Sequence, residues 1–152
     1  MKKLFVAALL AAVILPFFSS CQKSDQASGN TSNSATFVGQ WQISKIIWQY
    51  YVDGSIREEA TEYMDAQNGE MFEFRADYTF VDVVTKDGVA YVPSNGTYVK
   101  TPSMIILTYP SYTMTLTIES LTANEAVVID EQTSESGGHV NKTVRRIFLR
   151  KL

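Results

Sequence analysis

Two residue types that often carry out chemistry occur once each in this 152-residue chain, as Cys21 and His139. His139 follows Gly137-Gly138, within a segment from Gln132 to Asn141 that we expect to be a flexible loop. A nucleophilic serine or cysteine needs a histidine held rigidly beside it, and a zinc site needs several cysteine or histidine ligands. We therefore expect no catalytic residue, no metal and no cofactor, and the protein is predicted not to be an enzyme.

Carboxylates are numerous enough for acid–base chemistry to be considered. The acidic candidates are Glu58, Glu62, Glu73 and Asp82. Asp82 is in phase with Phe80, and an inward carboxylate is costly unless it is paired. We expect a bulge after Phe80 that turns Asp82 outward and leaves Val81 and Val83 facing inward. A hydrolase that uses a carboxylate pair is the least favoured function, because it requires two of the four acids to converge in a cleft.

The setting of Cys21 indicates a different chemistry. Met1-Lys2-Lys3 is positively charged, and Leu4 to Phe18 is an almost unbroken apolar run that is short for a membrane span. Small residues, Ser19-Ser20, come directly before Cys21. This order of charged, apolar and small residues predicts a secretory signal over residues 1–20.

Leu15 to Cys21 resembles the end of a bacterial lipoprotein signal peptide. The resemblance implies that Cys21 is acylated, with palmitate among the acyl chains, and becomes the mature N-terminus. Such acyl chains would anchor the protein in a membrane, since each buried methylene contributes about 0.8 kcal/mol. We expect an outer-membrane protein on the periplasmic face or the cell surface. Lys23-Ser24-Asp25 stands where such lipoproteins often carry a surface-export signal, but it has only one acid and does not decide between the two faces.

Residues 21–36 are predicted to be a disordered tether. Gln22 to Thr36 contains no aromatic and no large aliphatic residue, so it cannot bury enough apolar surface to offset the entropy lost on ordering. The formal net charge of the chain is −3, and removal of Lys2 and Lys3 with the signal makes it more negative. Since a negative domain repels phosphate backbones, nucleic acid is not an expected partner.

Residues 37–152 are predicted to form one all-β domain. A long strand runs from Gly39 to Val52, and its alternation shifts near Lys45, which predicts a β-bulge. Ser55 and Glu58 form a capping-box pattern, from which we expect one short helix over Ile56 to Ala66.

Short strands separated by turn residues follow. Asp87-Gly88 predicts a tight hairpin, and Tyr112 to Leu121 alternates strictly between apolar and polar residues. In the last strand, Lys142 to Lys151, both phases are about equally apolar, so the sequence does not select which phase faces inward. We expect eight main strands, or nine, in an antiparallel up-and-down barrel whose first and last strands pair and so remove both edges.

A family resemblance rests on the order of several short motifs. They are Gly39-Gln40-Trp41, Phe72-Glu73-Phe74, Asp77-Tyr78-Thr79-Phe80, Gly96-Thr97-Tyr98, Leu107-Thr108-Tyr109 and Ile118-Glu119-Ser120-Leu121. Together they resemble the lipocalin-like domains of Bacteroidetes lipoproteins. The resemblance implies a barrel closed at one end by Trp41, with Arg145 or Arg146 over its ring in a cation–π contact.

An eight-stranded barrel is either filled by its own side chains or holds one small ligand. The leading prediction is that the open end binds a small apolar or amphipathic ligand. The residues predicted to line the site are Trp48, Phe74, Phe80, Tyr98, Leu116 and Ile118. The alternative is a filled barrel that serves as an interaction module for an envelope protein partner, with the acidic segment from Arg57 to Asp82 as its contact surface.

Overall fold

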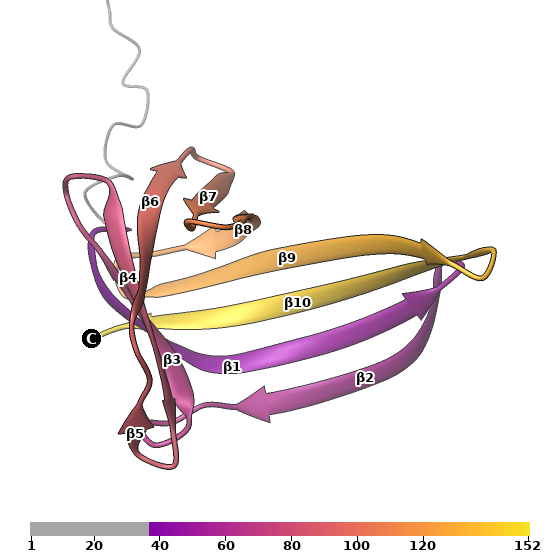
Figure 1. The fold of residues 1–152 in the computed structure, drawn as a ribbon, viewed down its shortest axis with the longest axis horizontal. Coiled ribbons are helices and arrows are strands. Elements are labelled where there is room, and N and C mark those ends of the chain that lie inside the picture. The colour runs from indigo at the N-terminus through magenta and orange to yellow at the C-terminus, as the bar shows by residue number, and fades with distance from the viewer. Residues whose placement is uncertain (1–36) are drawn as a thin grey trace, which may run out of the picture.

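The computed structural model describes residues 37–152, and its elements are ten β-strands (Figure 1). The strands are β1 Gly39–Val52, β2 Ser55–Tyr63, β3 Gly69–Phe74, β4 Thr79–Lys86, β5 Val89–Ala90, β6 Ser94–Lys100, β7 Met104–Thr108, β8 Thr113–Leu121, β9 Glu125–Ser136 and β10 His139–Lys151. Within this range there is no helix with the length and apolar character that a membrane crossing requires.

Eight of the strands close into an antiparallel barrel. Neighbouring strands pair in the order β1, β3, β4, β6, β7, β8, β9 and β10, and β10 pairs again with β1. The predicted pairing of the first and last strands is therefore confirmed. The predicted bulge near Lys45 is also present, because the β1–β10 register shifts between Ile43 and Lys45.

Three barrel strands continue beyond the barrel and, together with β2, form a projecting sheet, which we call the wing. It consists of β2, the second half of β1, the first half of β10 and the second half of β9, and it extends to the right in Figure 1. The wing arises because β1 pairs with β3 only over Gly39–Gln42, whereas its second half, Lys45–Val52, pairs with β2. The sheet order ends at β2, so the outer edge of β2 has no neighbouring strand in the described chain.

The predicted helix over Ile56 to Ala66 is wrong, because Ser55–Tyr63 forms strand β2. Asp53 and Gly54 have φ values of 49° and 78°, a pair of positive angles that suits a two-residue hairpin turn. This turn sends the chain back along β1, whose second half would otherwise be an open edge. All nine residues of β2 are exposed, so no buried apolar face was available to stabilise a helix there.

The predicted loop from Gln132 to Asn141 is also wrong. β9 continues to Ser136, β10 starts at His139, and Gly137 and Gly138 form the turn with φ values of 61° and 80°. At this tip of the wing, His139 Nδ1 lies 2.6 Å from Asp53 Oδ2, and both side chains are exposed.

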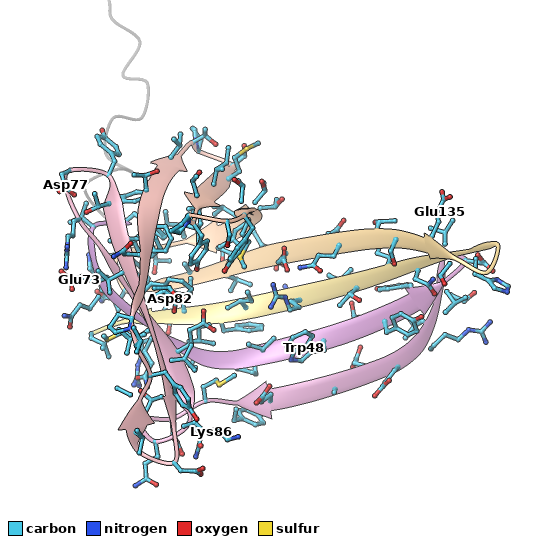
Figure 2. The ribbon with its side chains drawn as sticks, in the orientation of Figure 1. Trp48, Glu73, Asp77, Asp82, Lys86 and Glu135 are labelled. Carbon is cyan, nitrogen blue, oxygen red and sulfur yellow. The ribbon has the colours of Figure 1, made fainter. Side chains whose placement is uncertain are left out.

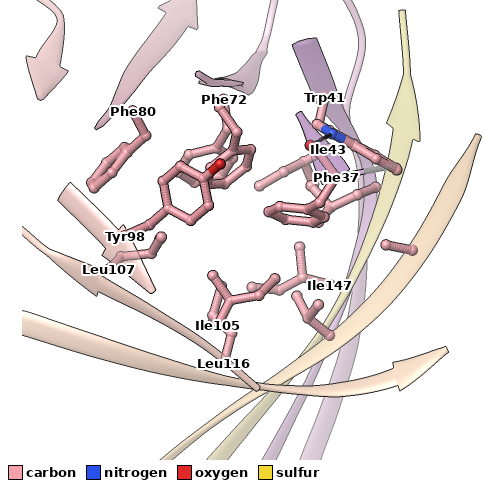
Figure 3. Packing of buried hydrophobic residues seen from close by; sticks show 14 of the residues in the cluster. Phe37, Trp41, Ile43, Phe72, Phe80, Tyr98, Ile105, Leu107, Leu116 and Ile147 are labelled. Carbon is pink, nitrogen blue, oxygen red and sulfur yellow. Dashed lines mark hydrogen bonds between the residues drawn. The ribbon is translucent and has the colours of Figure 1, made fainter. Parts of the chain in front are cut away.

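An aromatic cluster fills the closed end of the barrel (Figure 3). Trp41 is completely buried, and its indole N–H donates a hydrogen bond of 2.7 Å to the backbone oxygen of Phe37. Phe37 packs on Phe74 with ring centroids 4.4 Å apart, and Phe74 contacts Tyr98 edge-on at 5.0 Å. Together these rings cap the barrel from within.

The partner of Trp41 differs from the expectation. Lys151 Nζ lies 5.5 Å from the centroid of the Trp41 ring, whereas Arg145 lies over Trp48 and Arg146 over Phe148. The register between β1 and β10 explains this, since it places Lys151 directly opposite Trp41. The prediction that Arg145 or Arg146 covers Trp41 is therefore wrong.

Replacement of the two tryptophans tests which one supports the barrel. We expect Trp41→Ala to lower the free energy of unfolding by about 3–5 kcal/mol, because it leaves a large cavity in a sealed core. Trp48→Ala should cost only about 1–2 kcal/mol, because Trp48 is only partly buried. Urea unfolding followed by far-ultraviolet circular dichroism measures both values, and equal losses would contradict the assignment of Trp41 as the closing residue.

Candidate ligand site at the open end of the barrel

The barrel interior contains a cavity of about 30 Å³, room for roughly two water molecules. Its lining is mostly apolar and comes from Phe37, Ile43, Ile46, Glu70, Phe72, Phe74, Ile105, Leu107, Met114, Leu116, Val128, Arg145, Ile147 and Leu149. Most of the interior is therefore filled by side chains, and the cavity as it stands does not hold a lipid.

The predicted lining residues separate into three groups. Phe74 and Leu116 line the cavity. Phe80 and Tyr98 are buried in the core, and Ile118 is partly buried against it. Trp48 lies outside the cavity, on the wing (Figure 2).

Asp82 faces into the barrel, and the prediction that it turns outward is wrong. The β3–β4 register is regular from Phe74 opposite Phe80 to Gly69 opposite Thr85, so no bulge follows Phe80. Asp82 is only 9% exposed. The Tyr109 hydroxyl donates a hydrogen bond of 3.1 Å to its Oδ2, whereas its buried Oδ1 has no hydrogen-bond partner among the described residues.

Glu70 is the acidic neighbour that the sequence analysis missed. It lies on β3 two residues before Phe72, on the same face of the strand, and it lines the cavity. Burial, followed by the negative charge of Asp82, raises the pKa of Glu70 to about 7, while Arg145 opposes the shift. Burial likewise raises the pKa of Asp82. The alternation of Glu70 with Phe72 and Phe74 was the signal that could have found it.

Tyr109 lies beside Asp82 within a small aromatic group. It packs edge-on against Phe80 at 4.9 Å and stacks on Tyr112 at 4.4 Å. Gly96 allows the close approach of β6 to β7 and Phe80, since a Cβ there would collide with the backbone oxygen of Thr108 and with the Phe80 ring. Burial and the charge of Asp82 raise the pKa of the Tyr109 phenol well above its ordinary value, so the hydroxyl stays protonated and remains a donor.

Arg145, which lines the cavity, forms an ion pair with Asp130. Arg145 Nε donates to Asp130 Oδ2 at 2.8 Å, and the Gln132 amide donates to the same oxygen at 3.3 Å. The inward phase of the last strand is the one that contains Arg145 and Ile147, because both line the cavity. Arg146, of the other phase, is exposed and binds Glu119.

The open end continues onto the wing. The Arg145 guanidinium lies 5.3 Å from the Trp48 ring centroid, and Trp48 forms part of a groove of about 250 Å³. The groove is lined by Trp48, Gln49, Tyr50, Glu58, Ala60 and Thr143. The inward phase of β1 thus runs from the cavity, past Arg145, onto an aromatic platform.

The acids that the sequence analysis singled out do not converge. Glu58 and Glu62 lie on the exposed strand β2, and Glu73 pairs with Arg75 at 2.9 Å on the barrel exterior. Asp82 alone of the four faces inward, where it meets Glu70 instead. Within residues 37–152, no three His, Cys, Asp or Glu side chains are grouped to hold a metal ion.

The raised pKa of Glu70 gives a measurable pH dependence of stability. The unfolded chain releases this proton near pH 4.5, whereas the folded protein holds it up to about pH 7, so the free energy of unfolding should fall between these values. We expect Glu70→Gln to remove about 2 kcal/mol of that fall. The matched control is Glu73→Gln, on the outer face of the same strand. Urea unfolding from pH 4.5 to 8 checks this, and an unchanged slope in Glu70→Gln would contradict it.

The family comparison agrees with the barrel. The match to the lipocalin-like domain family covers residues 37–128. No curated protein is detectably similar in sequence. A solved structure of a lipocalin-like protein from Bacteroides uniformis is 20% identical, with 77% of this chain and 99% of that chain covered and a TM-score of 0.49.

Two further solved structures are similar. An uncharacterized protein from Bacteroides eggerthii is 15% identical, with 72% of this chain and 98% of that chain covered and a TM-score of 0.44. A deswapped triple mutant of bovine odorant binding protein is 14% identical, with 77% of this chain and 75% of that chain covered and a TM-score of 0.39. The family match spans more than half of the chain and shows that this protein belongs to the lipocalin-like domain family.

Proposed function

We propose that this protein is a non-enzymatic, lipid-anchored envelope protein that binds a small, partly apolar ligand at the open end of its barrel. The observation that supports this most is the continuity of the inward face from the cavity, past Arg145, to the groove over Trp48. Ligand sites are commonly concave and mostly apolar, with a few polar groups that fix orientation. The open end has these properties.

The size of the site limits the ligand. The cavity of about 30 Å³ admits only a short apolar end, and the groove of about 250 Å³ has room for the remainder. Met114 lines the cavity and is only half-buried. Because methionine is unbranched and flexible, Met114 is the side chain best able to move and enlarge the cavity.

The membrane anchor belongs to the proposal and rests on sequence. Cys21, the signal over residues 1–20 and the tether over residues 21–36 lie outside the described residues. Acylation of Cys21 would hold the barrel near the outer membrane, on the periplasmic face or the cell surface.

Binding of an apolar fluorescent probe, 1-N-phenylnaphthylamine, to the mature protein tests the ligand site. We expect Met114→Trp to weaken binding about tenfold or more, because the larger side chain fills the entrance of the cavity. Thr115→Trp is the control, since Thr115 is exposed on the same strand. Probe fluorescence measures the affinity. Absence of binding to the wild type, or equal effects of the two variants, would contradict the proposal.

A second candidate function is a protein contact along β2. The nine residues of β2 are exposed, and its outer edge has no neighbouring strand in the described chain. Such an edge can accept an extended segment of another protein as an added strand. Of the acidic segment from Arg57 to Asp82, only β2 is free for this role, because β3 and β4 belong to the barrel wall.

Site-specific cross-linking in cells tests the edge. A photoreactive residue in place of Thr61 on β2 should form an adduct with another envelope protein. The same residue in place of Thr117, exposed on the barrel strand β8, should form none. The candidate is contradicted if position 61 yields no adduct or if both positions yield the same one.

A further inference from the structure

The inner face of the open end carries more acid than base. Glu70 comes from β3, Asp82 from β4 and Asp130 from β9, and Arg145 is the one cation among the residues that line the cavity in the described chain. Arg145 is committed to Asp130 through its Nε and a second guanidinium nitrogen. Glu70 and Asp82 are therefore left without a cation bound directly between them.

Asp82 has a buried acceptor that, among its neighbours, only a protonated Glu70 can satisfy. Its Oδ2 accepts the Tyr109 hydroxyl, but its buried Oδ1 has no hydrogen-bond partner among the described residues. A buried carboxylate oxygen without a donor costs free energy that a bound donor would recover. Glu70 can supply that donor only while its own carboxyl group is protonated, because an ionised carboxylate can only accept.

We propose that Glu70 and Asp82 form the recognition site for a cationic head group, such as the ammonium of an alkylamine, whose apolar part enters the cavity. The inference rests on the proposed ligand-binding function and deepens it by naming the class of ligand. An ammonium carries three donors, so it can bind Asp82 Oδ1 and the Glu70 carboxylate at the same time. It would replace the proton that the two acids otherwise share.

The surroundings favour an organic cation over a metal ion. Only two carboxyl groups and one phenol meet here, and no group of three metal-ligating side chains exists in residues 37–152. The cavity beside Glu70 is lined mainly by aliphatic and aromatic side chains. An apolar chain attached to the cation would therefore bury surface that a bare ion cannot.

Binding should be linked to the Glu70 proton. The charged and titratable groups near Glu70 on the inside are Asp82, Tyr109, Asp130 and Arg145. On the same phase of their strands, Glu62 of β2 and Lys86 of β4 line a surface groove that Glu70 also borders. An alkylammonium stays charged up to about pH 10, so a change in affinity between pH 5.5 and 8 would report the protein's own groups.

The experiment compares three six-carbon probes on the mature protein by isothermal titration calorimetry: hexylamine, 1-hexanol and hexanoate. We expect hexylamine to bind about tenfold more tightly than 1-hexanol at pH 8, and hexanoate to bind weakest. The hexylamine affinity should rise severalfold from pH 5.5 to 8, whereas the 1-hexanol affinity should not change. Glu70→Gln should abolish both the preference and the pH dependence, and Glu73→Gln should retain them.

The outcomes separate the two proposals. If 1-hexanol binds as tightly as hexylamine, the cation site is wrong while ligand binding at the open end still stands. If none of the probes binds, ligand binding itself is contradicted. If Glu70→Gln does not fold, as judged by circular dichroism, the wild-type pH dependence decides, and a flat hexylamine affinity overturns the cation site.

Discussion

The pairing of β1 with β10 is the constraint on which the rest of the structure depends. It runs from Trp41 opposite Lys151 to Val52 opposite Asn141. Its first part closes the barrel and removes the two edges that an open meander would expose. Because both strands are longer than the barrel requires, the same pairing continues outward and builds the centre of the wing.

The bulge within this pairing decides what faces the interior. The register shifts between Ile43 and Lys45, so Ile46 and Trp48 lie on the same side as Trp41 and Ile43. One strand therefore contributes the closing tryptophan, part of the cavity wall and the aromatic platform of the groove. The opposite strand contributes Lys151 over Trp41 and Arg145 over Trp48.

The two ends of the barrel have different physical characters. The closed end is packed with aromatic rings and stabilises the fold by burying apolar surface. The open end contains Glu70 and Asp82, which are buried beside each other with raised pKa values and therefore lower the stability of the fold. Groups that cost stability and retain an unused acceptor are commonly found where a protein binds something.

Local patterns in the sequence determined the barrel strands, the Asp-Gly turn at residues 87–88 and the bulge near Lys45. These follow from the two-residue period of a strand and from the backbone angles that turns require, and both act between neighbouring residues. Strand β2 could not be predicted from such patterns, because a segment with nine exposed residues has no buried face and so no apolar periodicity. The open edge of β1 decided its conformation.

Tertiary structure alone decided the site. Asp82 faces inward because β4 pairs with β3 without a bulge, and Lys151 meets Trp41 because of the β1–β10 register. Glu70 and Asp82 become neighbours only when β3 and β4 are aligned, and Tyr109 joins them from the segment that follows β7. Sequence periodicity shows which residues share a face of one strand, whereas contacts between strands depend on registers that the whole barrel sets.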